Sequence, residues 1–121
     1  MGAFRAAVES GDPAQISATL SPEVTFRSPA VHAPYVGRDT VQAVLTAVTQ
    51  VFEDFRYVAH LVDGDQEMLR FNARVGGRDV DGVDIVRYDE NGQVAELSVM
   101  IRPLSALNAV REAMAVQLGL A

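Results

Sequence analysis

The chain has 121 residues, enough for one domain with a hydrophobic core but too few for two. Ten basic and sixteen acidic residues give a net charge of −6. This balance argues against nucleic acid as a partner, because affinity for it comes largely from Lys and Arg neutralising phosphates. Cysteine and lysine are both absent, which excludes disulfides, Cys-ligated metals, thiol nucleophiles and Schiff-base lysines. With only two histidines as well, we expect neither a metal site nor a cofactor.

The distribution of apolar residues is that of a globular protein. Hydrophobic residues make up 49% of the chain and charged residues 21%. No apolar run approaches the roughly 18 residues of a membrane span, and the first residues lack the charged-then-apolar pattern of a signal peptide. We therefore expect a single domain over residues 1–121, cytoplasmic and without a membrane partner.

The residues up to Gly37 predict two short helices, a strand and a loop. Gly11 separates the helices, and Asp12–Pro13 supplies an N-cap and a first-turn proline for the second. Alternation of apolar and polar residues over 24–28 indicates a short half-buried strand. The residues from 28 to 37 then form a loop.

The rest of the chain predicts a long helix, four strands and a closing helix. Apolar residues at three- and four-residue spacing indicate a helix over 38–54. From Phe55 the period changes to two, which predicts four strands at about 55–62, 66–75, 78–88 and 93–102, separated by turn sequences. Pro103 then suits the first turn of the closing helix. Runs of strands beside helices predict an α+β fold, in which helices pack on one face of a curved, mainly antiparallel sheet of about five strands.

The turns predict which side chains share a face of the sheet. A two-residue Gly76–Gly77 turn places Leu69 opposite Asp84, and a turn at Asn91–Gly92 places Asp84 opposite Val99. One face is then apolar except for Asp84 and meets the helices. The other face mixes charged residues with Met68, Val83, Ile85, Val94 and Met100. Such a face is too apolar for solvent alone, so we expect a homodimer through it.

Asp84 is the most informative residue of the chain. A carboxylate on an apolar face loses hydration, which raises its pKa and lets the neutral acid donate a hydrogen bond or a proton to a ligand oxygen. The alternative is a structural Asp bonded to a backbone group or an Arg, or one at the wet rim of the sheet. Gly82 removes a side chain opposite Phe71, so we expect a ligand to approach the sheet there.

The remaining polar candidates are weaker. His32 and Tyr35 lie on the loop after the first strand, where a pocket could open, although an exposed loop histidine without a role is the more common case. Tyr57 and His60 are predicted on opposite faces of their strand, and the turn at 63–65 leaves open which of them faces inward. Ser28 ends the first strand on the side of its apolar residues, either as a ligand contact or as a satisfied hydroxyl.

Several motifs in order carry a family resemblance over nearly the whole chain. They are Glu9–Asp12 at the end of the first helix, Leu20–Phe26 leading into the first strand, Tyr35–Arg38 before the long helix, and Gly82–Val94 in the central hairpin. With them the sequence resembles the SnoaL-like branch of the nuclear transport factor 2-like superfamily. The resemblance implies a cone-shaped α+β fold, commonly dimeric, with a pocket between the curved sheet and the helices.

The resemblance also bears on activity, since the group includes polyketide cyclases, ketosteroid isomerases, scytalone dehydratases, limonene-epoxide hydrolases and many non-enzymes. By position Asp84 resembles the acid that helps to bind the oxyanion in ketosteroid isomerases. The catalytic base of those isomerases would fall at Ser28 and their oxyanion tyrosine at Phe4. The acid that limonene-epoxide hydrolases carry on the last strand would fall at Val99. These departures leave an apolar pocket with one inward acid.

Two functions follow as hypotheses. The first is an acid–base isomerase or cyclase acting on an apolar, oxygenated, polyketide- or steroid-like compound, with Asp84 as the catalytic residue and His32 and Tyr35 as weaker catalytic candidates. The second is a non-catalytic ligand-binding or dimerisation module, which the missing base at Ser28 favours. In either case the residues expected to contact the small apolar ligand are Phe26, Ser28, Phe52, Tyr57, Phe71, Gly82 and Val99.

Overall fold

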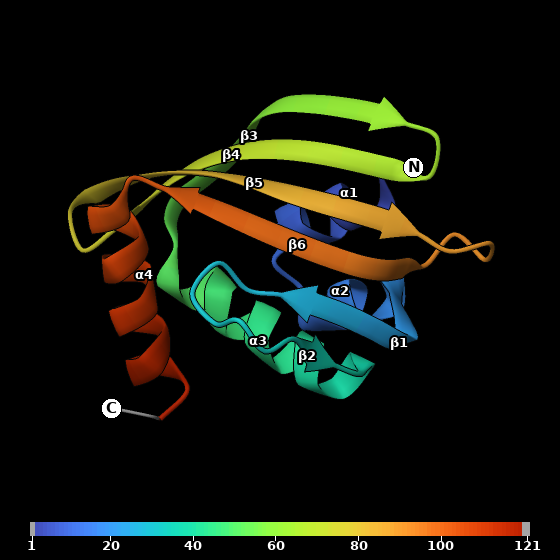
Figure 1. The fold of residues 1–121 in the computed structure, drawn as a ribbon, viewed down its shortest axis with the longest axis horizontal. Helices are drawn as coiled ribbons and strands as arrows, with labels where there is room; N and C mark the ends of the chain where they lie inside the picture. Colours follow the sequence, from blue (N-terminus) through green and yellow to red (C-terminus); the bar gives the residue numbers. More distant parts are fainter. Residues whose placement is uncertain (1, 120–121) are drawn as a thin grey trace.

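A computed structural model describes residues 2–119, which form four helices and six strands (Figure 1). In chain order the elements are α1 (Ala3–Ser10), α2 (Pro13–Thr19), β1 (Leu20–Arg27), β2 (Tyr35–Val36), α3 (Arg38–Val51), β3 (Glu53–Asp63), β4 (Gln66–Val75), β5 (Arg78–Tyr88), β6 (Val94–Arg102) and α4 (Leu104–Gln117). Over the described range, no helix is both long enough and apolar enough to span a membrane.

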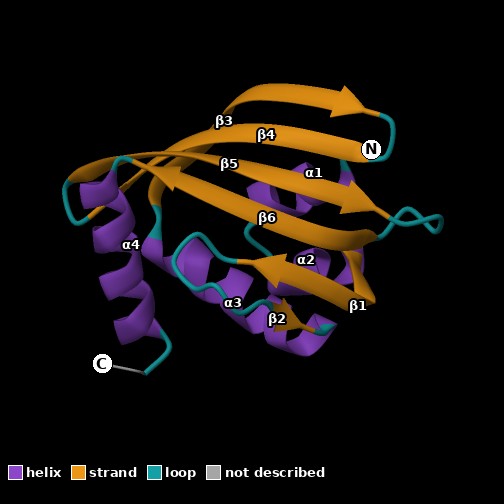
Figure 2. Ribbon diagram, in the orientation of Figure 1, coloured by secondary structure: helices purple, strands orange, loops and turns teal. Residues whose placement is uncertain are grey.

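The strands form one curved sheet in the order β2-β1-β6-β5-β4-β3, with the helices packed against its concave side (Figure 2). Strand β1 pairs with β2 antiparallel and with β6 parallel, whereas the pairs among β3, β4, β5 and β6 are antiparallel. This confirms the predicted α+β class. The sheet has six strands instead of about five, because Tyr35 and Val36 of the predicted loop pair with the edge of β1.

Helix α3 ends at Val51, three residues earlier than predicted. The backbone of Phe52 is already extended, and β3 begins at the next residue. The ring of Phe52 nevertheless points into the core, where it packs 5.9 Å from Phe55 and 5.6 Å from Phe71 between ring centroids. The apolar spacing therefore continues past the end of the helix, and spacing alone cannot locate that end.

The predicted register of the central strands is confirmed. Leu69 pairs with Asp84 and Asp84 pairs with Val99. A bulge near the β5–β6 turn, however, shifts the pairing by one residue, so that Val94 is fully buried on the inner face. Its predicted place on the outer face is wrong, because a bulge inserts one residue and reverses the alternation beyond it.

A second bulge changes the geometry of β3. Tyr57 pairs with Phe71 and His60 pairs with Leu69, with a register shift between Tyr57 and Ala59. Because Phe71 and Leu69 share the inner face, both Tyr57 and His60 face the helices. The predicted placement of these two residues on opposite faces is therefore wrong, for the same physical reason.

The core consists of two apolar clusters. The larger one joins α1, α2 and α3 to the sheet around Phe4 and Leu97, and the other lies beneath α4 around Phe71. Three half-buried residues pack against both clusters: Tyr57, Val99 and Met114. The space between the clusters contains the candidate site.

Candidate functional site

A cavity of about 600 Å³ lies between the inner face of the sheet and helices α1, α3 and α4. This volume suits a ligand of drug or steroid size. The wall is mostly aliphatic and aromatic, and it includes the three residues that join the two core clusters. Its polar and charged members are Glu9, Ser28, Tyr35, Thr49, Arg56, Tyr57, Asp84 and Arg111.

Asp84 and Tyr57 form a hydrogen-bonded pair on this wall. Asp84 lies in the middle of β5 with only 8% of its surface exposed, between the apolar residues Leu69 and Val99. The Tyr57 hydroxyl donates to Asp84 Oδ2 over 2.8 Å. Within residues 2–119 no other side chain donates to this carboxyl group, so a ligand in the cavity could use Oδ1.

The surroundings of the pair set its proton chemistry. Loss of hydration raises the pKa of Asp84 to about 7, although the hydrogen bond from Tyr57 opposes the rise. Burial, followed by the negative charge of Asp84, pushes the pKa of Tyr57 far above its ordinary value. At neutral pH, Asp84 can therefore both accept and release a proton, while Tyr57 remains a neutral donor.

An aromatic cluster holds Tyr57 in place and makes this end of the cavity apolar. The rings of Phe55 and Tyr57 meet edge to face with centroids 5.0 Å apart, and Phe55 stacks on Phe71 at 5.1 Å. Contacts of this kind stabilise aromatic pairs beyond the burial of their area. The alternating apolar residues at the start of β3 and in β4 thus supply both the register and the low polarity around the carboxyl group.

Most of the predicted site residues are brought together on the cavity wall. Those that line it are Phe26, Ser28, Tyr35, Phe52, Tyr57, Phe71, Asp84 and Val99. Tyr35 is half-buried and its ring stacks on Phe26 with centroids 6.0 Å apart. His32 is exposed on the loop and does not line the cavity, although Val31 before it and Tyr35 after it do.

Gly82 does not provide the approach for a ligand that the sequence predicts. The ring of Phe71 already occupies the space that a side chain at Gly82 would need. A Cβ atom added there would lie 2.2 Å from Phe71 Cζ. The glycine therefore makes room for a neighbouring core ring, and a ligand in the cavity meets Phe71 instead.

A second acid, Glu67, faces inward and was not predicted from the sequence. Glu67 is completely buried, lies 2.6 Å from His60 Nε2 and accepts a 2.6 Å hydrogen bond from the Tyr88 hydroxyl. The predicted register could have identified it. Glu67 lies two residues before Leu69, so the same register places it on the inner face opposite Val86. It lies outside the cavity wall, so its role differs from that of Asp84.

Solved structures resemble this chain closely in fold. A steroid delta-isomerase from Pseudomonas aeruginosa is 38% identical with a TM-score of 0.92, over 96% of this chain and 86% of that protein. A bacterial protein with a cystatin-like fold from Silicibacter pomeroyi is 35% identical with a TM-score of 0.93, over 98% and 84% of the two chains. An NTF2-like protein from Burkholderia xenovorans shares the fold at 17% identity, with a TM-score of 0.71 over 88% and 87%.

The family follows from the sequence itself. None of the curated proteins matches the chain. The family model of the SnoaL-like domain matches residues 1–97, which run from α1 into β6 and include both Tyr57 and Asp84. The chain shares its fold with NTF2-like proteins. The resemblance drawn from the motifs is confirmed by the family model, and the chain belongs to the SnoaL-like domain family.

Proposed function

We propose that this protein is an acid–base isomerase or cyclase that acts on an apolar, oxygenated compound of steroid- or polyketide-like type. The observation that carries the proposal is a buried carboxyl group, Asp84, which has a tyrosine partner and an oxygen left for a ligand in an apolar cavity. A carboxyl group with a pKa of about 7 is matched to proton transfer at neutral pH. The name of the Pseudomonas aeruginosa relative supports the isomerase class.

The proposed chemistry needs only one titrating group. Ionised Asp84 takes a proton from the carbon between the carbonyl group and a carbon–carbon double bond, and the electron pair of the broken C–H bond is delocalised as a dienolate. The neutral acid then returns the proton to the far carbon of the dienolate, which moves the double bond into conjugation and leaves Asp84 ionised again. The reaction consumes no oxidant. It also needs no base at position 28, where this chain has a serine. Throughout, the Tyr57 hydroxyl bonds to the carboxyl group and fixes its orientation.

The test is conversion of a β,γ-unsaturated 3-ketosteroid to its conjugated isomer, followed by the ultraviolet absorbance of the product. We expect turnover that rises with pH around a midpoint near 7, as Asp84 ionises. A second assay should use a polyketide-like β,γ-unsaturated ketone. Absence of conversion in both assays, with the protein shown to be folded, contradicts the enzymatic proposal.

The second candidate, a non-catalytic binding module, is favoured by one observation. Ser28 lines the cavity at the position where the resemblance places an isomerase base, and it cannot act as a base at neutral pH. This candidate predicts that the same ketones shift the NMR signals of cavity residues without being converted.

The hydrogen bond from Tyr57 gives a direct prediction. Tyr57→Phe removes the donor that lowers the pKa of Asp84, so the midpoint for ionisation of Asp84 should rise by about one pH unit above its wild-type value. Carbon-13 NMR of the carboxyl group measures this midpoint. Tyr35→Phe is the matched control, because Tyr35 lines the same cavity at a different point of the wall. Equal midpoints in the two variants would rule out the assigned hydrogen bond.

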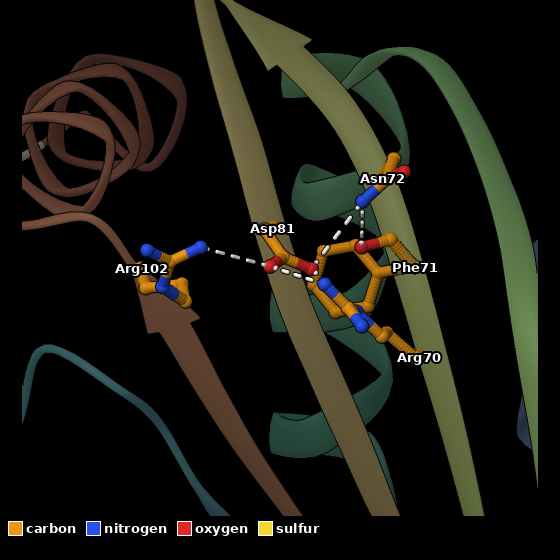
Figure 3. A network of polar contacts seen from close by, with 5 residues as sticks. All are labelled: Arg70, Phe71, Asn72, Asp81 and Arg102. Atoms are coloured by element: carbon orange, nitrogen blue, oxygen red, sulfur yellow. Dashed lines mark hydrogen bonds and ion pairs between the residues drawn. The ribbon is translucent and has the colours of Figure 1, made fainter.

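The outer face of the sheet supports a proposal about assembly. Met68 pairs with Ile85 and Val83 pairs with Met100, so four apolar side chains lie next to one another across β4, β5 and β6. Beside them the Asp81 carboxylate accepts hydrogen bonds from Arg70 at both oxygens and from Arg102 over 3.3 Å, so this acid is paired within the chain (Figure 3). We propose that two copies of the chain associate through this face.

The predicted dimer can be tested by sedimentation. At micromolar concentration the wild-type protein should have about twice its monomer mass of 13.0 kDa. Met100→Asp should weaken association by at least about tenfold, because Met100 is 59% exposed and two carboxylates would face each other across a two-fold interface. Val116→Asp is the control, since Val116 is also largely exposed, at 67%, but lies on α4. A wild-type protein that stays monomeric would overturn the proposal.

A further inference from the structure

We infer that Arg5 is a positioning residue for the Tyr57–Asp84 pair, held over the ring of Tyr57 by His60 and the buried Glu67. The inference rests on the proposed function in one respect: that function makes the proton affinity of Asp84 important. It is carried by a continuous series of contacts that leads from the interior of the sheet, through α1, to the cavity wall. Its members are Tyr88, Glu67, His60, Arg5, Tyr57 and Asp84.

The inner end of the series is rigid. Glu67 is fully buried on β4, and its two carboxyl oxygens have different partners, Tyr88 on β5 and His60 on β3. A buried carboxylate is tolerated only when such hydrogen bonds replace its lost hydration. Since the partners come from both neighbouring strands, the sheet itself fixes the position of the His60 ring.

The contact between His60 and Arg5 determines which nitrogen of the imidazole carries the proton. Arg5 Nη1 lies 3.3 Å from His60 Nδ1. A guanidinium group can only donate, so Nδ1 must be the unprotonated, accepting nitrogen. The ring proton then sits on Nε2 and donates to Glu67 over 2.6 Å. Neutral His60 therefore connects a buried acid on the sheet to a cation on α1.

This connection places a positive charge beside Tyr57. The guanidinium carbon of Arg5 lies 5.6 Å from the centroid of the Tyr57 ring, and Arg5 Nε also contacts Glu9 one turn along α1, over 3.3 Å. Cations at this distance are attracted to the face of an aromatic ring. Burial and the negative charges of Asp84 and Glu9 raise the pKa of Tyr57. The positive charge of Arg5 acts in the opposite direction on this pKa. It thus makes the hydroxyl a better donor to Asp84 Oδ2.

A purely structural role for Arg5 would be to tie α1 to β3. Such a tie would affect stability but not the proton affinity of Asp84. The midpoint of Asp84 ionisation separates the two roles, and it is measured without any substrate. A failure to find turnover would therefore refute the proposed function and leave this inference intact. An unchanged midpoint of Asp84 ionisation after substitution of Arg5 would refute this inference and leave the proposed function intact.

The decisive experiment compares Arg5→Gln with Arg78→Gln by carbon-13 NMR of the Asp84 carboxyl group over a pH titration. Both variants lose one positive charge, but Arg78 is exposed at the start of β5, six residues before Asp84. We expect Arg5→Gln to raise the midpoint by about half a pH unit, moderated by the partial exposure of Arg5, and Arg78→Gln to leave it unchanged. Equal midpoints in the two variants overturn the inference.

Two further variants test the role of His60. In His60→Gln the amide can still donate to Glu67 and accept from Arg5, so the midpoint should stay near the wild-type value. His60→Leu removes both bonds and should raise the midpoint toward that of Arg5→Gln. A wild-type midpoint in His60→Leu contradicts the anchoring role. If His60→Leu does not fold, His60→Asn decides in the same way, because its shorter amide cannot reach both Glu67 and Arg5.

Discussion

Asp84→Asn should abolish turnover and, at neutral pH, stabilise the fold. The substituted side chain keeps the shape of the original and can still accept the Tyr57 hydrogen bond, but it cannot transfer a proton. Loss of a positioned acid–base group typically lowers rates by about 10²- to 10⁴-fold. Steady-state measurement of ketone isomerisation at pH 7 checks this part of the prediction.

The stability effect follows from the difference in the pKa of Asp84 between the folded and unfolded chains. Burial raises this pKa from its ordinary value of 3.8 to about 7. Between these values the folded protein holds a proton that the unfolded chain has lost. The stabilising contribution is therefore complete below about pH 4 and is lost as the pH rises through 7, a change of at most about 4 kcal/mol. Asp84→Asn cannot titrate, so its stability should not show this fall.

Urea unfolding at pH 5 and pH 8 measures the effect. We expect the variant to gain stability relative to the wild type at pH 8 and to gain less at pH 5. Asp81→Asn is the control, since hydrogen bonds from Arg70 hold the pKa of Asp81 below its ordinary value. The ionised Asp81 carboxylate stabilises the fold at pH values above its pKa in the unfolded chain. Asp81→Asn should therefore show no gain in the free energy of unfolding at pH 8. A loss of more than about 2 kcal/mol at neutral pH in Asp84→Asn would instead identify Asp84 as an ionised structural acceptor.

Gly82→Ala should destabilise the protein by about 1–3 kcal/mol, the usual cost of inserting a group into a packed core. The new methyl group would lie 2.2 Å from Cζ of Phe71 and 2.6 Å from its Cε2, so the ring would have to move. Denaturant unfolding measures the change in the free energy of unfolding. Movement of the ring would also alter the cavity, because Phe71 forms part of its wall.

A double-mutant cycle tests the cause. Phe71→Ala alone should cost about 3–5 kcal/mol, because it leaves a cavity in the core beneath α4. In the double variant, the methyl group at position 82 enters the space that the ring has left. The double substitution should therefore cost less than the two single costs together. Strictly additive costs would show that the ring and the glycine do not compete for this space.

Local chemistry in the sequence was enough to place Asp84 inside the fold. The two-residue turn at Gly76–Gly77 has positive φ angles at both positions, which glycine adopts without steric cost, and this one turn fixes the pairing of β4 with β5. Once the pairing is known, alternation assigns each residue to a face. The order of strands and helices predicted the α+β class, and the family motifs, which occur in order along the chain, added the cone shape and the expected pocket.

The partners of Asp84 were decided by the tertiary structure alone. Tyr57 reaches it across 27 residues because a bulge in β3 turns both Tyr57 and His60 inward, and the alternation of residue types does not record where an extra residue is inserted. The Phe71 ring fills the space beside Gly82, where it packs against Phe52 and Phe55 from other parts of the chain. Short-range periodicity determines faces and turns, whereas hydrogen-bond partners, bulges and ring positions depend on residues distant in the chain that meet only after folding.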